Sequence, residues 1–331
     1  MARFQPAIAP FSIQTTMIVT FDTNSYRKLI ENLTTDQVRM LVADIKRAEK
    51  DKGIKPMMSP LTAMELLSHM LDDESSRSYQ SCRKAVIAIY GHCGDEKSFN
   101  LLPSPQAQIS LEYFGTHNKK AEETAKALGI AAFQIWKKPQ KSTVETYRDT
   151  FDSIKRHVSE SENCLIEEIK SLGRKIDPGY TDWNLFVNDQ EKRKSYLNFV
   201  RSPQFARETA LAMLCAVHIQ IADIADPKHL DPEVLKSKVD VFIKSYDTAI
   251  NLRRFFFEQI LNPGFDLSAK SRANYLWDEQ ILYFVGHTIN SEKILLVTGD
   301  KKMHEAAKKS NLSNSVANLA SYLDMLGMTA R

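Results

Sequence analysis

Two short apolar runs, far apart in the chain, each end abruptly at polar residues. Residues 18–21 lead into Asp22 and Asn24, and residues 294–297 lead through a short turn into Asp300. A continuous apolar run of this kind is typical of a strand buried on both faces. We predict that the two runs are neighbouring parallel strands, which places both aspartates at the same edge of a sheet. Each aspartate is equally well suited to capping the helix that follows its strand.

The segments around these strands alternate between helix and strand signals. Thr34 and Gln37 have capping-box spacing and open a predicted helix that runs to about Lys52. Residues 55–59 form a short apolar segment that we interpret as another strand. Pro60 then begins a helix, because proline suits the first helical position. This alternation predicts an α/β core, in which helices flank a parallel sheet.

The block of residues 73–267 has a different pattern, without a convincing strand. Helical periodicity is clearest in segments 142–172, 205–224 and 232–261, which glycine and proline separate from one another. The a/d spacing in the first segment favours a helical-hairpin core over a zipper with a partner. The second segment is apolar nearly all round, which predicts a central buried helix. The whole block is therefore expected to be an all-α insertion into the α/β core.

A further helix is predicted for residues 268–289, directly before the second strand. Asp278 shares its apolar stripe with Ile281 and Val285, so helical geometry places this carboxylate toward the core. Glu279 lies about 100° round the helix and is expected to face away. A buried carboxylate needs a partner, because an isolated charge is costly to bury. That partner is either a buried basic residue in a salt bridge or a cation shared with other carboxylates.

Glu65 lies at the margin of the apolar face of the helix that begins at Pro60. Its neighbours on the helical wheel are Leu61 and His69. This position suits a carboxylate that reaches toward the edge of the sheet. Thr62 and Glu65 also have capping-box spacing, in which case the glutamate would only bind a backbone N–H. The upstream helix start at Pro60 weakens that alternative.

Composition and cysteine usage narrow the class of protein. The 331 residues are 43% hydrophobic and 26% charged, which is sufficient for a well-buried core. We expect no membrane span, because the sequence has no run of about eighteen apolar residues, and residues 1–14 lack the apolar stretch of a secretory signal. The four cysteines are scattered without C-x-x-C spacing. Neither a disulfide framework nor a zinc site is expected, and a cytoplasmic protein fits this pattern.

Four short motifs, taken together, resemble the PIN-domain nuclease family. Residues 19–24 are similar to the first PIN strand, which ends in Asp-x-Asn, and residues 59–66 are similar to the second motif, in which a glutamate follows a short strand and opens a helix. Residues 276–281 resemble the third motif, an acidic residue on an apolar helix. Residues 296–303 resemble the fourth, a strand that ends in Thr-x-Asp-Lys. The four motifs occur in the family's order and in the expected secondary-structure context.

The resemblance implies a discontinuous PIN-like nuclease core of residues 1–72 and 268–331, with residues 73–267 as a helical insertion. Small PIN proteins have only a short helical connection there, so the insertion leaves the subfamily and the substrate open. We expect the insertion to leave and re-enter the core beside the site and to overhang it. The resemblance further implies hydrolysis of phosphodiester bonds that leaves a 5′-phosphate and a 3′-hydroxyl.

Elementary chemistry agrees with a metal-dependent site. Four carboxylates at one edge would repel one another, and a bound divalent cation removes that penalty. Oxygen ligands without Cys or His suit Mg²⁺ or Mn²⁺, which can activate water and neutralise charge on a scissile phosphate. The expected catalytic residues and metal ligands are Asp22, Glu65, Asp278 and Asp300. The residues expected to orient them, which are as well suited to shaping the turns, are Asn24 and Thr298.

The charge distribution fits a polyanionic substrate. Residues 1–72 contain nine Lys/Arg and eight Asp/Glu, residues 268–331 contain eight and six, and the block between them is neutral, so the net charge of +3 lies on the core. A basic surface around an acidic, metal-filled centre attracts nucleic acid. In residues 253–257, Arg-Arg-Phe-Phe-Phe, core packing is favoured over a basic-aromatic binding strip. The candidates for holding substrate phosphates, which are equally compatible with solvated helix starts, are Arg27, Lys28, Lys301 and Lys302.

Two functions from different classes remain. The first is a cytoplasmic endoribonuclease, either the toxin of a toxin–antitoxin pair or a defence nuclease, with RNA as substrate and a protein inhibitor or antitoxin as partner. The second is a catalytically silent PIN-fold binding protein that acts through its helical insertion. All four acidic positions are filled, which favours the enzyme. A DNA-directed nuclease is a narrower alternative, and monomer and homo-oligomer are both compatible with the sequence.

The sequence lacks the motifs of three other enzyme classes. The sequence around Lys97 lacks the glycine that a P-loop requires before its lysine. A haloacid-dehalogenase-like phosphatase requires a second aspartate where this chain has Asn24. The G-x-S-x-G motif of serine hydrolases is absent from the sequence.

Overall fold

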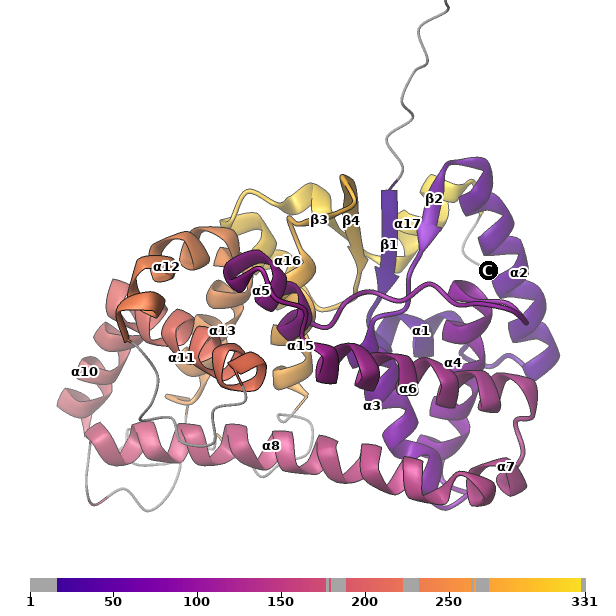
Figure 1. The fold of residues 1–331 in the computed structure, drawn as a ribbon, viewed down its shortest axis with the longest axis horizontal. Helices are drawn as coiled ribbons and strands as arrows, with labels where there is room; N and C mark the ends of the chain where they lie inside the picture. Colours follow the sequence, from indigo (N-terminus) through magenta and orange to yellow (C-terminus); the bar gives the residue numbers. More distant parts are fainter. Residues whose placement is uncertain are drawn as a thin grey trace, which may run out of the picture.

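A small mixed sheet lies at the centre of a mostly helical protein (Figure 1). The computed structural model describes residues 17–176, 179, 189–222, 232–262, 265 and 274–328. Within this part of the chain the strands lie in the order β2–β1–β4–β3, and β5 pairs with β4. The strands are β1 (Met17–Phe21), β2 (Ile54–Pro56), β3 (Thr288–Ile289), β4 (Glu292–Val297) and β5 (Val316–Ala317).

The register of the sheet places the ends of β1 and β4 together. The two strands pair in parallel with Phe21 opposite Val297, which confirms the predicted neighbouring parallel strands. β2 pairs in parallel with β1, and β5 pairs in parallel with β4. The prediction of a wholly parallel sheet is wrong, because β3 is antiparallel to β4. Asn290 and Ser291 both have positive φ and form the two-residue turn of this hairpin, a geometry that matches the twist of the paired strands.

Helices surround this sheet. In chain order they are α1 (Thr23–Leu29), α2 (Thr35–Asp51), α3 (Pro60–Leu67), α4 (Arg77–Cys93), α5 (Pro105–Phe114), α6 (Lys119–Lys137), α7 (Lys141–Thr146), α8 (Arg148–Ile176), α10 (Gln190–Arg201), α11 (Pro203–Ala222), α12 (Pro232–Ser245), α13 (Asp247–Gln259), α15 (Tyr275–Ile281), α16 (Lys301–Lys309) and α17 (Leu319–Leu326). The short 3-10 turns are η1 (Ser68–Leu71), η3 (Leu282–Phe284) and η4 (Ser313–Ser315).

Local sequence signals determine where several of these helices begin. The predicted capping box of α2 is present: Gln37 N–H donates to the hydroxyl of Thr34, and Thr34 N–H donates to the side-chain oxygen of Gln37. α3 begins at the predicted proline, with Ser59 in the N-cap position. The Thr34 cap satisfies N–H groups that have no partner within α2, whereas the side chain of Ser59 makes no cap hydrogen bond and α3 relies on the proline at its first turn. These signals therefore determine where α2 and α3 begin.

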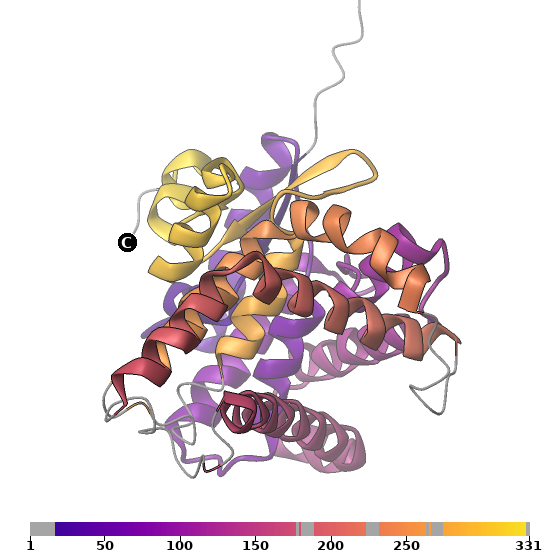
Figure 2. The same cartoon turned by 90° about the vertical axis from the view of Figure 1, so that its left-hand side faces the viewer.

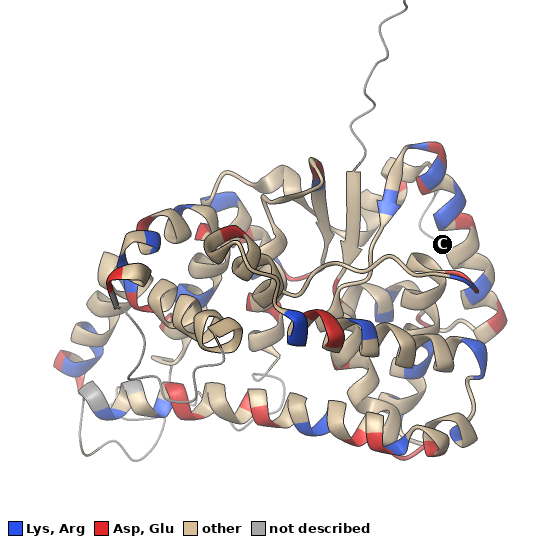
Figure 3. Cartoon of the chain, in the orientation of Figure 1, with Lys and Arg blue, Asp and Glu red and all other residues tan. Residues whose placement is uncertain are grey.

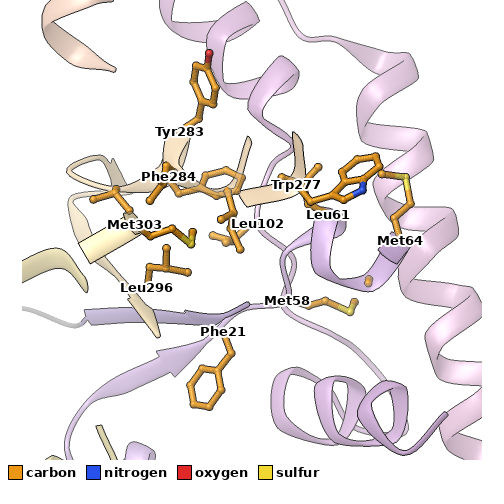
Figure 4. Close-up of a cluster of buried hydrophobic side chains, with 14 of the residues drawn as sticks. Phe21, Met58, Leu61, Met64, Leu102, Trp277, Tyr283, Phe284, Leu296 and Met303 are labelled. Carbon is orange, nitrogen blue, oxygen red and sulfur yellow. The ribbon is translucent and has the colours of Figure 1, made fainter. Parts of the chain in front are cut away.

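The two faces of the sheet bury different sets of side chains. The ring of Phe21 packs at 5.1 Å from His92 of α4 and at 5.2 Å from Tyr322 of α17. On the other side of the strands lie Leu296 and Met303, the latter on α16 (Figure 4). All five are less than 3% exposed. Burial on both faces explains why the strands read as unbroken apolar runs.

The long helix α8 crosses beyond the carboxyl ends of β1 and β4 (Figures 1 and 2). It contacts α3 and the turn η1 that follows α3. One of these links is the ion pair between Lys155 of α8 and Asp72, at 2.9 Å. The insertion therefore passes over the edge of the sheet where the candidate carboxylates were expected.

The described part of residues 73–267 forms helices without any named strand. It does not separate cleanly from the core, because α4 packs against α1, α2 and α3. His92 of α4 bonds to Glu49 of α2 at 2.8 Å, and both are buried. The boundary at residue 72 therefore stays a prediction, since the helix that follows it is part of the central packing.

Three predicted helices differ from the structure. The helix expected over 142–172 is divided at Tyr147 into α7 and α8. The helix expected over 232–261 is divided at Tyr246 into α12 and α13. The helix expected over 268–289 is described only from Tyr275, ends at Ile281, and gives way to η3 and β3; its predicted start lies outside the described residues. No glycine or proline marks the breaks at Tyr147 and Tyr246, whereas Gly286, with φ of 87°, lies in the turn between η3 and β3.

The helix expected to be central, α11, lies with one side toward the outside. Phe205, Leu214 and Val217 are buried, but Ala212 and Ala216 are exposed. By length and composition alone α11 is apolar enough to cross a membrane, a test that core helices of soluble proteins also pass. This single helix is weak support for a span.

Candidate metal centre at the edge of the sheet

One threonine joins the aspartates at the ends of β1 and β4. Thr298 donates its hydroxyl to Oδ2 of Asp22 at 2.5 Å and accepts the backbone N–H of Asp300 at 3.0 Å. Both aspartates also cap helices: Oδ1 of Asp22 accepts from Ser25 N–H at 2.6 Å, and Oδ1 of Asp300 accepts from Met303 N–H at 3.0 Å. The capping role considered from the sequence is therefore present in both. Each cap uses Oδ1; Oδ2 of Asp22 binds Thr298, and Oδ2 of Asp300 takes no part in its cap.

Glu65 reaches the same edge from α3. It lies well inside the helix, so the capping-box alternative with Thr62 is wrong. Thr62 instead donates to the backbone carbonyl at the end of β1 at 3.2 Å, and Thr23 donates its hydroxyl to Oε2 of Glu65 at 2.5 Å. Burial raises the pKa of Glu65 to about 7; the bond from Thr23 lowers it and the charge of Asp22 raises it.

Asp278 approaches from α15, and its surroundings disfavour the charged carboxylate. Burial raises its pKa well above the ordinary range, and the charges of Asp300, Glu65 and Asp22 raise it further. Burial also raises the pKa of Asp22, although the bonds from Thr298 and Ser25 offset part of that effect. The four carboxylates thus lie close enough to repel one another, as expected for a cluster without a cation.

Three of the four carboxylates line one pocket. Its volume is about 340 Å³ including its open mouth, and its walls come from the start of α1, one face of α3, and α15. Asp22, Glu65 and Asp278 belong to the lining, whereas Asp300 lies outside it at the start of α16. Asp300 still acts on the pocket electrostatically, since its charge raises the pKa values of Asp22 and Asp278.

The partner of Asp278 is not a basic residue in the described part of the chain. The salt bridge considered from the sequence forms at the neighbouring position: Glu279 is 3% exposed and accepts two bonds from Arg253, at 3.1 and 2.9 Å. The prediction that Glu279 faces away from the core is therefore wrong. The helical wheel could not reveal this, because the buried Arg253 comes from another helix, α13.

The four carboxylates are suitable ligands for a hard divalent cation, but they are not spaced to hold one as they stand. Among the described residues, no Lys, Arg or His nitrogen lies within 4.0 Å of the four carboxylates. Carboxylate oxygens in such surroundings are the ligands that Mg²⁺ and Mn²⁺ prefer. Within the same part of the chain, however, no three Asp, Glu, His or Cys side chains stand close enough together to hold an ion as they are. The bonds that turn Glu65 toward Thr23 and Asp22 toward Thr298 would have to adjust.

The remaining predicted site residues occupy different places. Asn24 lines the pocket mouth with an exposed side chain, and in the described residues no hydrogen bond joins it to a carboxylate. Arg27 is half-buried, donates to Ser81 at 3.2 Å, and lowers the pKa of Glu65 by its charge. Lys301 and Lys302 are exposed at the start of α16, and Lys28 is exposed in the last turn of α1.

Two residues near the carboxylates were missed by sequence reasoning. Thr23 holds Glu65, and its hydroxyl between Asp22 and Asn24 was the available signal. Glu162 of α8 accepts from the indole N–H of Trp277 at 3.3 Å, and its charge raises the pKa of Glu65. α8 carries many acidic and basic residues (Figure 3), so nothing in the sequence singles out Glu162.

Packing below the pocket fixes α3 against α15. The ring of Trp277 lies beside Leu61 and Met64 of α3 (Figure 4), and all three are buried. The two helices that supply Glu65 and Asp278 therefore share an apolar contact.

Comparisons with protein-family models, with curated proteins and with solved structures found no match to this chain.

Proposed function

We propose that this protein is a metal-dependent nuclease with a PIN-like core, and that it hydrolyses RNA. The observation that carries the proposal is Asp278: a half-buried carboxylate without a basic partner among the described residues, facing the charges of three others. Proteins seldom retain a repulsive cluster of partly buried carboxylates unless it does chemical work, because each unpaired charge destabilises the fold. A bound Mg²⁺ or Mn²⁺ offsets the repulsion.

The four carboxylates Asp22, Glu65, Asp278 and Asp300 are the residues that would hold the ion. When bound, such an ion supplies an activated water and neutralises charge on the scissile phosphate. The chain itself supplies orientation: Thr298 holds Asp22, and the caps of α1 and α16 hold one oxygen of each aspartate in place.

The substrate would approach along α1 and the start of α16. Both helices present exposed lysines there, Lys28 on α1 and Lys301 and Lys302 on α16. Their ammonium groups are suited to phosphate oxygens. RNA is favoured over DNA by the PIN resemblance and by the lack of a separate DNA-binding motif in the sequence. A cytoplasmic location and a protein inhibitor remain part of the same proposal.

Cleavage of mixed RNA and DNA oligonucleotides, with Mg²⁺ or Mn²⁺ and with EDTA, tests the proposal. We expect metal-dependent RNA cleavage by the parent and none by Asp22→Asn, Asp278→Asn or Asp300→Asn, because a neutral amide binds these ions less well. Asparagine is itself a good N-cap, so the helix starts should survive. Asp324→Asn is the matched control, since Asp324 is an exposed aspartate of α17.

Two results would contradict the nuclease. EDTA-insensitive cleavage would mean that the activity comes from elsewhere, and acidic-site variants as active as the parent would remove the carboxylates from the mechanism.

Mn²⁺ should also raise the melting temperature of the parent more than that of the three variants, by binding only the folded state.

A catalytically silent PIN-fold binding protein is the second candidate. One observation favours it: in the described residues no three acidic or histidine side chains stand ready for an ion, and two of the aspartates already serve as caps. This candidate predicts neither cleavage nor a Mn²⁺-dependent rise in melting temperature. The thermal measurement therefore separates the two functions without knowledge of the RNA target.

A further inference from the structure

Asp278 lies between two anchored neighbours on a very short helix. α15 has only seven residues, so its own backbone hydrogen bonds do little to fix its rotation. The preceding residue, Trp277, donates its indole N–H to Glu162 of α8 at 3.3 Å. The following residue, Glu279, accepts from Arg253 of α13 at 2.9 Å. Successive side chains on a helix are about 100° apart, so holding both neighbours determines the direction of Asp278.

Arg253 is the centre of this anchor. It is largely buried, and its Nη2 also contacts Glu168 of α8, so one guanidinium ties α15, α13 and α8 together. Its planar group lies 5.1 Å from the ring centre of Phe257. The fork of an arginine fixes a carboxylate in orientation as well as in distance.

We propose that Arg253 is a positioning residue: by holding Glu279 it fixes the rotation of α15 and so directs Asp278 into the pocket. The inference rests on the proposed function, in which Asp278 is a metal ligand. Residues outside the ligand set are known to set ligand orientation, and their loss commonly weakens metal binding by about 10–100-fold. It also assigns the helical insertion a part in building the site, because Arg253 and Glu168 both belong to it.

The experiment compares Mn²⁺ affinity with fold stability. Mn²⁺ binding is measured by calorimetry for the parent, Arg253→Lys and Glu279→Gln, each at a temperature well below its own melting transition. Both changes keep the volume and remove the two-pronged contact. Arg254→Lys is the matched control: Arg254 is the next residue of the same helix, but it donates to the carbonyl of Ser202 at 3.3 Å and to Asn251.

We expect Arg253→Lys and Glu279→Gln to weaken Mn²⁺ binding about tenfold or more, while Arg254→Lys stays within about twofold of the parent. A merely stabilising ion pair would lower melting temperatures and leave the affinity of the folded protein unchanged, and that result would overturn the inference. If Arg253→Lys does not fold, Glu279→Gln decides. A parent that binds no Mn²⁺ would overturn the proposed function and this inference with it.

Discussion

Glu49 and Asp278 are carboxylates on helices packed around the same sheet, yet their surroundings are opposite. Glu49 is fully buried and bonds to His92 at 2.8 Å and to the hydroxyl of Tyr322 at 2.5 Å. Asp278 is half-buried, and no hydrogen bond or ion pair reaches its side chain from the described residues. The pKa of Asp278 is raised well above the ordinary range by burial and by three like charges.

The difference separates structural charge from functional charge. A buried carboxylate with a cation and hydrogen bonds is a completed interaction, and breaking it leaves a group that nothing else can satisfy. A carboxylate surrounded by other carboxylates is incomplete, and the folded protein would be more stable without it. Removing one charge should therefore have opposite signs in the two regions.

The largest expected effect is at the compensated pair. His92→Leu should lower the free energy of unfolding by about 3–5 kcal/mol, because Glu49 would remain buried without its cation. Urea unfolding followed by circular dichroism measures the loss. The double variant Glu49→Leu/His92→Leu should recover much of it, since replacing both partners by apolar groups removes the unpaired charge. A single variant that loses less than about 1 kcal/mol would show that the pair behaves like a surface contact.

The His92–Glu49 pair should also lose its stabilising effect at alkaline pH. Burial lowers the pKa of His92, but the charge and hydrogen bond of Glu49, together with Cys93, more than offset this and raise the pKa from 6.5 to about 10. A raised histidine pKa means that the stabilisation is complete below pH 6.5 and is lost as the pH rises through about 10. Between pH 6.5 and pH 10, titration of His92 should lower the free energy of unfolding by about 1.4 kcal/mol per pH unit.

Midpoints of urea unfolding, measured from pH 6 to pH 10.5, test this loss of stability at alkaline pH. The parent is compared with the double variant Glu49→Leu/His92→Leu, so that titration of exposed lysines and tyrosines cancels. Equal pH profiles would mean that His92 is neutral in the folded protein and that its bond to Glu49 carries no charge.

Sequence reasoning succeeded where the determinant is local. The apolar runs before Asp22 and Asp300, the capping box at Thr34, and the proline start of α3 all depend on neighbouring residues, and all were located correctly. The pairing of β1 with β4 followed because two similar strand ends favour a common edge. These features brought three of the four carboxylates to one pocket and the fourth within electrostatic reach.

Sequence reasoning failed where the determinant is a tertiary partner. Glu279 is buried because Arg253 of another helix meets it, and Glu162 approaches the site because α8 crosses the edge of the sheet. Neither contact has a sequence signature, since a partner 26 or 115 residues away leaves no periodicity. The end of α15 at Ile281 was missed for another reason: the apolar periodicity was extended through Gly286, which has positive φ in the turn between η3 and β3.

The smallest expected effect has the opposite sign and tests the comparison most directly. In EDTA, Asp278→Asn should raise the free energy of unfolding by on the order of 1 kcal/mol, because it removes one of four mutually repelling carboxylates and no known favourable contact. Asp324→Asn, at an exposed position, should stay within about 0.5 kcal/mol of the parent. In Mn²⁺ at 100 times the dissociation constant, the parent should gain about 2.7 kcal/mol and overtake the variant, whose binding is impaired. Thermal unfolding of the three proteins in both buffers measures the reversal. If Asp278→Asn is instead less stable than the parent in EDTA, Asp278 has a favourable partner, and the distinction between a structural charge at Glu49 and a functional charge at Asp278 does not hold.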